Sequence, residues 1–411
     1  MEESIYDVVI IGAGPAGSTA AAMLANAGKS VLVVEKQEFP RFSIGESLLP
    51  QCMTFIEEAG LLDAVMDNAE RLGFQYKEGA AFYHNGNKVD FDFRKKSSEG
   101  PGTTYQVKRE HFDQLLAQGA AEKGAEIRHG VALEAIDFND RNTVKLSLTG
   151  AAGTSEAKAR FVLDASGFGR VLPRLLSLES PSDFPVRQAV FCHVKSELAG
   201  GNFDRSKILI TVHPKNPEIW YWLIPFADGT ASIGVVGASE YFAESDSEKE
   251  ALWKLVADEP YLLEVLGEYQ VSRAEQRITG YSANVNCLFG DRFALLGNAG
   301  EFLDPVFSSG VTIAMQSSSL AVPLVLKELN DEPQNWQKLY SDPLRVGITT
   351  FRTFVKGWYD TRFQDVIFYP HQQQQVKEMI CSILAGYAWD TGNPYVRDSE
   401  RRLNVLAELC G

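Results

Sequence analysis

The chain has 411 residues, of which 45% are hydrophobic and 23% are charged, a composition typical of a globular protein with two or three packed units. A formal net charge of −15 argues against nucleic acid and against anionic membranes as partners. Five singly spaced cysteines and six dispersed histidines favour neither a disulfide framework nor a metal site, and without a basic leader or a spanning apolar run we expect a cytoplasmic protein.

The first expected element is a buried strand over residues 5–11, because its apolar residues are nearly continuous. The sequence GAGPAG follows, and an alanine-rich helix is expected to run to about Asn26. A second strand over 29–34 ends at Glu35. This order of elements predicts a bound dinucleotide on a Rossmann-like unit, because it contains a strand, a glycine turn, a helix, a second strand and an acid.

Each residue of this unit has a physical task. Gly12 permits the tight turn, Gly14 lets the pyrophosphate approach the backbone, and Gly17 lets the helix pack on the strand. The helix start supplies free N–H groups to phosphate, and Glu35 can accept hydrogen bonds from a ribose. The residues expected to contact the dinucleotide here are Gly12, Ala13, Gly14, Pro15, Ala16, Gly17, Glu35 and Lys36.

A polar, glycine-containing loop, FPRFSIGESLLP, follows over residues 39–50. It contributes Arg41, Gly45, Glu46 and Ser47 as candidate cofactor contacts, and taken alone the same pattern also suits a solvated loop.

The next expected elements belong to a second, antiparallel sheet. Residues 72–82 alternate apolar and polar side chains, and Asn85-Gly86 predicts a hairpin turn between apolar strands. Lys77 lies on the polar face of the first of these strands. For a lysine in an arbitrary strand, pairing with neighbouring Glu78 and exposure to water is the expected state.

Two further strand ends return to the nucleotide-binding unit. Residues 105–116 predict a strand that runs into an amphipathic helix, with Arg109 at the junction, where it can reach a phosphate. Buried strands over 161–169 and 293–300 end at Asp164 and at Gly297-Asn298. This order of motifs resembles the FAD-dependent monooxygenase superfamily typified by aromatic hydroxylases, which implies FAD, bound non-covalently, rather than NAD, with Arg109, Gly297 and Asn298 among the cofactor contacts and Asp164 structural.

Three motifs narrow the resemblance. GESLLP at 45–50 looks like one version of the flavin-contacting loop, and WYWLIP at 220–225 matches W-x-W-x-I-P. Residues 302–310 match F-x-x-P-x-x-S-x-G. Together they resemble the flavin-dependent halogenase family. The resemblance implies that Trp220 and Trp222 fill space near a tunnel between flavin and substrate, although both also suit a packed sheet.

The resemblance places the turn at 302–315 on the flavin and at a halide. Ser308 and Ser309 suit a helix N-cap, and Gly310 permits close approach of a ligand. The amides of Ser309 and Gly310 are expected to hold chloride or bromide, while a serine cap with contact to flavin N1 and O2 is the alternative. The residues expected to contact the cofactor here are Pro305, Ser308, Ser309, Gly310 and Val311. Glu301 departs from the family pattern, because a carboxylate beside a halide opposes it electrostatically.

The resemblance also implies a catalytic role for Lys77, which lies in F-x-x-K-x-G-A. In this family such a lysine meets the hypohalous acid made at the flavin, and either donates a hydrogen bond to it or forms a haloamine. Burial shifts the pKa of a lysine readily enough for the second role.

The expected architecture is α/β, or α+β overall. A discontinuous FAD domain is expected over residues 1–72, 105–175 and 275–330, and a sheet-based substrate domain over 73–104 and 176–274. Residues 331–411 are expected to be helical, with Phe351, Phe354 and Trp358 in a stripe that suits a core seam and is also a candidate lid over the substrate.

Three functions follow from these patterns. The leading expectation is halogenation of an electron-rich aromatic or carrier-bound substrate by reduced FAD, oxygen and halide, with a separate flavin reductase because no second dinucleotide motif is present. The alternative is an FAD monooxygenase, hydroxylase or reductase that uses NAD(P)H directly, which Glu301 and Asn298 keep open. The third is a flavin-binding protein without catalytic turnover. The motifs at 220–225 and 302–310 disfavour it, because flavin binding alone needs neither of them.

Overall fold

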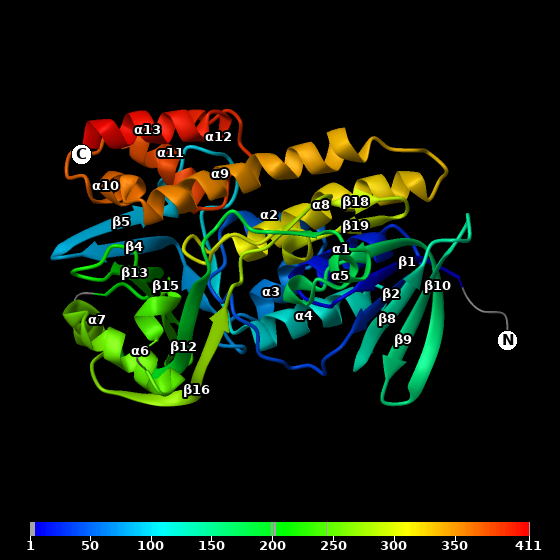
Figure 1. Cartoon of the computed structure of the whole chain (residues 1–411), viewed down its shortest axis with the longest axis horizontal. Coiled ribbons are helices and arrows are strands. Elements are labelled where there is room, and N and C mark those ends of the chain that lie inside the picture. The colour runs from blue at the N-terminus through cyan, green and yellow to red at the C-terminus, as the bar shows by residue number, and fades with distance from the viewer. Residues whose placement is uncertain (1–4, 199, 201–202, 244, 411) are drawn as a thin grey trace.

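Two β-sheets side by side organise the computed structural model, which describes residues 5–198, 200, 203–243 and 245–410. Figure 1 shows the sheet that contains β1 on the right and the sheet that contains β12 on the left, with the two long helices α8 and α9 passing above them. Residues 1–4, the start of the expected FAD domain, lie outside the described residues.

The first sheet has eight strands, and its core is parallel. In spatial order it contains β18 (Phe289–Gly290), β19 (Phe293–Leu295), β10 (Gly153–Asp164), β1 (Ile5–Ile11), β2 (Val31–Glu35) and β7 (Glu126–His129). From β19 to β7 every neighbouring pair is parallel, whereas β18 is antiparallel to β19. β8 (Val131–Asp137) and β9 (Val144–Gly150) form an antiparallel extension on the first half of β10. The near-continuous apolar run in β1 follows from its central position, because helices cover both faces of a parallel sheet.

Three helices connect this sheet to the rest of the molecule. α1 (Pro15–Asn26) packs against α4 (Arg109–Glu122) and α8 (Gly310–Glu328). The helix, strand and second strand expected around the glycine turn are therefore present, which confirms the Rossmann-like α/β unit.

The second sheet has seven strands and is mixed. Its order is β16 (Tyr269–Thr279), β12 (Arg187–Ser196), β15 (Thr230–Ala238), β14 (Trp220–Pro225), β13 (Lys207–Val212), β4 (Gly79–His84) and β5 (Asn87–Asp92). Neighbouring strands are antiparallel except β4 and β13, which are parallel. The expected second, antiparallel sheet is therefore present, with one parallel pair inside it. A long segment through the first sheet separates β4 from β13, and such a connection permits a parallel pair that a hairpin does not.

Lys77 does not belong to this second sheet. It ends β3 (Gln75–Lys77), which pairs with β6 (Thr104–Gln106) in a small sheet of two strands. The chain changes partners at Glu78, whose amide donates to Ser206 O.

Helices cover both faces of the seven-stranded sheet. α6 (Glu248–Ala257) and α7 (Pro260–Leu266) lie on one face, at the lower left of Figure 1. The expected helical C-terminal region lies over β4 and β5, at the upper left. It contains a π-helical turn (Gln337–Ser341), α9 (Asp342–Tyr359), α10 (Arg362–Phe368), α11 (Gln374–Leu384), α12 (Pro394–Arg397) and α13 (Ser399–Cys410). Phe351, Phe354 and Trp358 of α9 are fully buried, as in a core seam.

Short elements complete the fold. They are α2 (Gln51–Glu58), α3 (Leu62–Asn68), α5 (Val171–Leu175), β11 (Glu179–Ser180), β17 (Asn284–Val285) and the 3-10 turns Phe93–Lys95, Gly167–Gly169, Ser239–Phe242 and Gly297–Ala299. The boundary expected at residue 274 falls inside β16, which continues to Thr279. Of the helices in the described ranges, none has the length and apolar character needed to cross a membrane.

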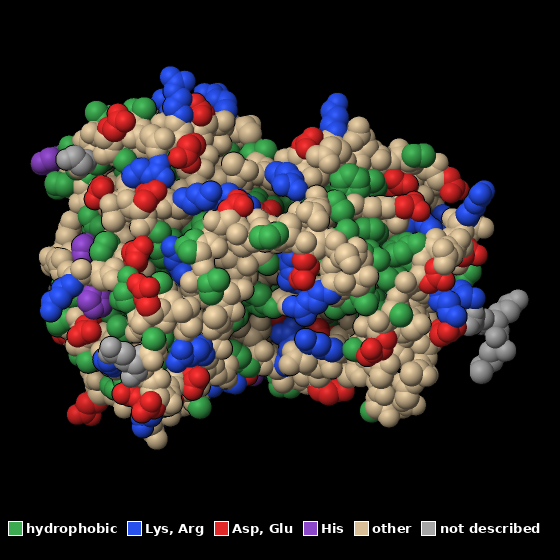
Figure 2. Space-filling model, viewed as in Figure 1, with side chains coloured by type: hydrophobic (Ala, Val, Ile, Leu, Met, Phe, Trp, Pro, Cys, Tyr) green, Lys and Arg blue, Asp and Glu red, His purple; other side chains and the backbone are tan. Residues whose placement is uncertain are grey.

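The surface carries charge of both signs. On the face drawn in Figure 2, acidic and basic side chains are interspersed rather than separated into blocks. This face therefore presents no basic block of the kind that binds nucleic acid.

The contact between α9 and the segment after α11 generates a stability prediction. An added Cβ at Gly347 would lie 2.1 Å from Cε2 of Trp389, so Gly347→Ala overpacks the interface. The clash outweighs the gain in helix propensity, and we expect the free energy of unfolding to fall by about 1–2 kcal/mol. Urea unfolding followed by circular dichroism measures it.

The matched control is Thr349→Ala, at an exposed position of the same helix. It should leave the free energy of unfolding unchanged or raise it slightly, because alanine is the better helix former. A Gly347→Ala protein as stable as the wild type would show that Trp389 moves aside without cost.

Candidate active site

A pocket lies where the two sheets approach each other. Its walls come from the β1–α1 turn, the 39–50 loop, the start of α4, the segment after β10, strands β13 and β14, and the segment that leads into α8. Parallel strands direct their carboxyl ends to one edge of a sheet, and in open α/β folds ligands bind at that edge.

The glycine turn at the start of α1 has the shape that a phosphate needs. Gly12 has φ +98°, and a Cβ there would meet Ala165 O at 2.6 Å. A Cβ on Gly17 would lie 1.9 Å from Gly12 O, which is the close helix–strand contact. At Gly14 the nearest atom is Arg41 Nη2 at 3.6 Å, so this position opens into the pocket. Gly14 caps α1 without a side chain, and the first amides of the helix stay available for an anion.

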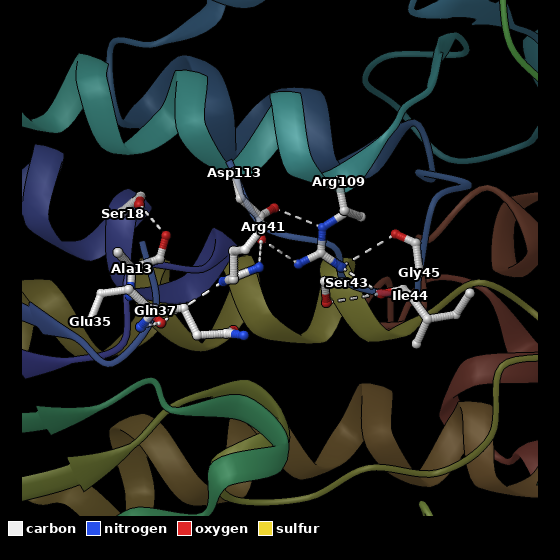
Figure 3. A network of polar contacts seen from close by, with 10 residues as sticks. All are labelled: Ala13, Ser18, Glu35, Gln37, Arg41, Ser43, Ile44, Gly45, Arg109 and Asp113. Carbon is white, nitrogen blue, oxygen red and sulfur yellow. Dashed lines mark hydrogen bonds and ion pairs between the residues drawn. The ribbon is translucent and has the colours of Figure 1, made fainter. Parts of the chain in front are cut away.

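A buried network of charged groups holds the loop that faces this turn (Figure 3). Asp113 accepts two hydrogen bonds from Arg109, at 2.7 and 2.9 Å, and one from Arg41 at 2.9 Å. Arg109 also donates to the carbonyl oxygens of Ile44 (2.8 Å) and Gly45 (3.4 Å). Both arginines line the pocket with their charge already paired. The two arginines therefore shape the loop, and both also remain at the surface of the pocket, where they can bind a phosphate.

Glu35 ends β2 beside this network. Its two oxygens accept hydrogen bonds from Ala13 N (2.9 Å) and Gln37 N (3.0 Å), and Arg41 lies 3.9 Å away. The carboxylate is thus oriented by backbone amides. Each oxygen retains a lone pair for a ribose hydroxyl.

The structure brings most of the expected cofactor residues to the pocket. Those that line it are Gly14, Pro15, Ala16, Glu35, Lys36, Arg41, Gly45, Glu46, Ser47, Arg109, Asn298, Pro305, Ser308, Gly310 and Val311. Gly12, Ala13, Gly17, Gly297 and Ser309 lie behind this surface and shape the turns that form it.

The turn before α8 departs from ordinary capping. Ser309 occupies the N-cap position, but its side chain makes no capping hydrogen bond. The expected serine cap is therefore wrong, and the first amides of α8 keep no side-chain partner. Ser308 has φ +55°, a left-handed conformation that is costly for a residue with a Cβ and is often found at functional sites.

A buried carboxylate anchors this strained turn. Asp304 accepts hydrogen bonds from the hydroxyls of Tyr281 (3.1 Å) and Tyr359 (2.9 Å) and from Val306 N (3.0 Å). Tyr359 belongs to α9 and also accepts from Trp220 Nε1 at 2.9 Å. Burial raises the pKa of Asp304, while the amide and hydroxyl donors oppose that rise. The C-terminal region thereby fixes the wall of the pocket.

Glu301 carries no free charge toward the pocket. Its buried carboxylate forms an ion pair with Arg352 of α9, which also pairs with Asp183 at 2.6 Å. This arginine offsets part of the electrostatic opposition that Glu301 presents to a halide, because it shares its charge with Asp183.

Lys77 is completely buried, so the exposed pairing with Glu78 is wrong; Glu78 pairs with Arg94 instead. Lys77 Nζ donates to Ser47 Oγ and to Leu48 O, both at 2.7 Å, and lies 5.4 Å from the centre of the Phe93 ring. Burial lowers the pKa of Lys77 from 10.5 to about 7. Ser47 lines the pocket, so a single side chain separates the pocket from the amine.

The two tryptophans of β14 lie on the pocket side of the second sheet. Trp220, Trp222 and Ile224 all line the pocket, and both rings are nearly fully buried. Trp222 Nε1 donates to Ser232 Oγ at 3.1 Å. They act as a packed wall and as a pocket surface at once.

Several lining residues were missed in the sequence. They are Gln37, Phe42, Ser43, Ile44, Ala165, Ser166, Gly167, Phe168, Gly169, Ile208, Leu296 and Ala314, with Phe302 known only as a motif position. Phe42 to Ile44 stand between Arg41 and Gly45, and Ser166 to Gly169 follow Asp164 directly, so continuity of the two loops was the available signal. Ile208 and Ala314 carry no such signal, because nothing separates an apolar pocket wall from an apolar core in a sequence.

The residues present suit a dinucleotide. A glycine-lined helix start offers amides to a pyrophosphate, an acid stands at the end of β2, and an apolar wall with tryptophans stands opposite a second helix start. The chemistry of these donors fits FAD from its adenosine end to its ring.

Comparison with known proteins agrees with this fit. Residues 5–316 match the family model described as an FAD binding domain. Over 99% of this chain and 95% of the other protein, the sequence is 29% identical to a 1H-pyrrole-2-carbonyl-[peptidyl-carrier protein] chlorinase of Pseudomonas fluorescens. It is 30% identical to a 1H-pyrrole-2-carbonyl-[peptidyl-carrier protein] brominase of Pseudoalteromonas luteoviolacea, over 79% of this chain and 78% of that one.

Solved structures give the same result. A flavoprotein/dehydrogenase from Cytophaga hutchinsonii superposes with a TM-score of 0.94 at 41% identity, covering 99% of both chains. A triple mutant of the flavin-dependent brominase Bmp2 superposes with a TM-score of 0.83 at 25% identity, covering 97% of this chain and 100% of the other. FAD is therefore the cofactor, as expected.

The glycine turn generates a prediction about cofactor affinity. Gly14→Ala should fold normally, because its Cβ meets only Arg41 Nη2, yet it should weaken FAD binding at least about tenfold by filling the approach to the backbone. Equilibrium titration of the apoprotein with FAD, followed by flavin fluorescence, measures the Kd.

Gly17→Ala tests the packing of the helix on the strand, whereas Gly14→Ala tests cofactor binding alone. Its Cβ would meet Gly12 O, so it should lower the thermal unfolding midpoint as well as the affinity. Unchanged affinity for FAD in Gly14→Ala would contradict a phosphate at this turn.

Proposed function

The chain belongs to the flavin-dependent halogenase family, and we propose that it halogenates an electron-rich aromatic substrate with Lys77 as the residue that carries the halogen. It is an FAD-dependent oxidoreductase. When bound, reduced FAD and oxygen supply the oxidising power that turns halide into hypohalous acid.

The observation that carries the proposal is the burial and depressed pKa of Lys77. Its two short hydrogen bonds, to Ser47 Oγ and Leu48 O, use the two N–H groups of a neutral amine and leave its lone pair free. A pKa of about 7 makes the neutral form abundant at neutral pH. The amine takes the halogen from hypohalous acid, forming an N–X bond and releasing water, and then passes it to carbon.

The other site residues act before this step. In this proposal Gly14, Arg41 and Arg109 bind the pyrophosphate and Glu35 binds a ribose, since all four residues line the pocket. The uncapped amides at the start of α8 favour an anion such as chloride or bromide, and the ion pair with Arg352 offsets part of the charge of Glu301. Trp220 and Trp222 keep bulky substrates out of the pocket.

The substrate and partners are proposed from the relatives. A pyrrole or phenol tethered to a carrier protein is the leading class, because the two pyrrole-carrier halogenases match most of their own length. A separate flavin reductase supplies reduced FAD. The five unpaired cysteines support a reducing cytoplasm.

A hydroxylase or reductase that uses NAD(P)H directly is the second candidate. The similarity to a flavoprotein/dehydrogenase favours it. The buried Lys77 would then be structural.

The reaction itself is the first test. Purified protein, reduced FAD, oxygen and bromide should convert members of a panel of phenols and pyrroles, free or carrier-bound, into brominated products seen by mass spectrometry, because the uncapped α8 amides and the buried Lys77 suit halide oxidation and transfer. Hydroxylated products, or rapid bleaching of the flavin by NADPH alone, would favour the second candidate.

The role of Lys77 is the second test. Lys77→Met keeps the volume, should retain FAD and should lower bromination roughly 100-fold or more. Because the amine loses its proton as the pH rises through about 7, wild-type bromination should increase across that pH and then level off.

The control is Lys195→Met, which removes an exposed strand lysine of β12 and should change nothing. Full activity in Lys77→Met, or a rate that falls as the pH rises through neutrality, would remove the neutral amine from the mechanism.

A further inference from the structure

Halide oxidation consumes protons in the flavin pocket. Anionic reduced FAD, oxygen, halide and two protons give oxidised FAD, hypohalous acid and water. A side chain that delivers protons to the pocket would assist this step, and general acids accelerate their steps roughly 100-fold or more. This inference rests on the proposed function.

Two carboxylates line the pocket among the described residues, and they differ in what binds them. Glu35 accepts a hydrogen bond from a backbone amide on each oxygen. Glu46 is 1% exposed and accepts no amide. Its Oε1 lies 2.8 Å from His193 Nε2, and its Oε2 has no hydrogen-bond partner within the described ranges.

An unpartnered carboxylate oxygen at this depth needs an explanation. Leaving a buried polar atom unsatisfied costs about 1–3 kcal/mol, and native proteins keep few such atoms. Glu46 stands between Gly45 and Ser47 and lines the same pocket as Trp220 and Trp222. A proton on Oε2 would make this oxygen a hydrogen-bond donor.

His193 lies outside the pocket lining, behind Glu46. It is 4% exposed and packs edge-on against the rings of Phe42 (5.8 Å) and Phe226 (5.4 Å). It is directly opposite Arg273 of β16 in the sheet register, toward the outer strand of the sheet. His193 therefore contacts Glu46 from the strand that lies next to the edge strand β16.

We propose that Glu46 is the proton donor of the flavin pocket and that His193 reloads it. Glu46 gives a proton to the oxygen species reduced at the flavin, and the carboxylate left behind takes one from His193. The imidazole is then reprotonated from the sheet edge.

The basic side chains around the pair already have hydrogen-bond partners of their own. Lys77 binds Ser47, Arg109 and Arg41 bind Asp113, Arg273 binds Glu110 at 2.6 Å, and Lys108 binds Asp228 at 2.5 Å. None of these partners hydrogen bonds to Glu46 or His193. Glu46 and His193 therefore exchange a proton with each other without breaking any of these contacts.

The experiment follows reoxidation of the bound flavin, which is separate from product formation. Holoenzyme reduced without oxygen is mixed with oxygen and bromide in a stopped-flow instrument, between about pH 6 and about pH 9. Glu46→Gln should bind FAD as tightly as the wild type and reoxidise roughly 100-fold more slowly, with a rate that falls as protons become scarcer. Formate should restore the rate in Glu46→Ala.

Two further variants make the result decisive. His193→Gln does not alter the pocket lining and should slow reoxidation as well. Glu259→Gln is the matched control, because Glu259 is equally buried, has an unpartnered Oε2 and lies away from the pocket at the start of α7. Three outcomes would each overturn the proposal. They are reoxidation at the wild-type rate in His193→Gln, a wild-type rate and pH profile in Glu46→Gln, and a loss of rate in Glu259→Gln equal to that in Glu46→Gln.

Proton stoichiometry separates this inference from the proposed function. A pH-indicator dye should report two protons taken up per reduced FAD with bromide, and one without it, when oxygen is reduced only to hydrogen peroxide. An uptake of one proton per reduced FAD both with and without bromide would reject halogenation. If reoxidation still depended on Glu46, its role as the proton donor would remain.

Discussion

Two buried basic side chains hold the segment 44–48 in place, and the site depends on that constraint. Arg109 binds the carbonyl oxygens of Ile44 and Gly45 from the side of the first sheet. Lys77 binds Ser47 and Leu48 from the small sheet formed with β6. Backbone carbonyls in a loop would otherwise need water, so these N–H donors let the segment run through the interior between the two sheets. One short stretch of chain therefore contributes to the pocket lining and also binds the Lys77 amine.

Charge compensation explains how so many ionisable groups are buried there. Asp113 is shared by two arginines, Asp304 is satisfied by two tyrosine hydroxyls and an amide, and Glu301 is matched by Arg352. Removing one partner of such a pair leaves an uncompensated buried charge, which is far more costly than losing a surface ion pair. Lys77 has neutral oxygen partners only, and its pKa falls because desolvation is not offset.

The C-terminal helices take part in the site although they are far from it in the chain. Tyr359 and Arg352, both on α9, contact Asp304 and Glu301 on the turn that precedes α8. A helix expected to form a core seam or a cover therefore also determines the electrostatics of the pocket. The fully buried Phe351, Phe354 and Trp358 show why its apolar stripe could be recognised from spacing, whereas its polar contacts could not.

The sequence by itself determined the features that depend on local geometry. Gly12, Gly14, Gly17 and Glu35 lie within one β–α–β unit, and their spacing is dictated by the turn that they form. Tertiary structure alone decided the state of each ionisable group, because a pKa depends on burial and on partners distant in the chain. The residue pattern alone favoured an exposed Lys77, and Glu301 appeared to oppose a halide. His193 belongs to no motif, and only the fold brings it beside Glu46, 147 positions away in the chain.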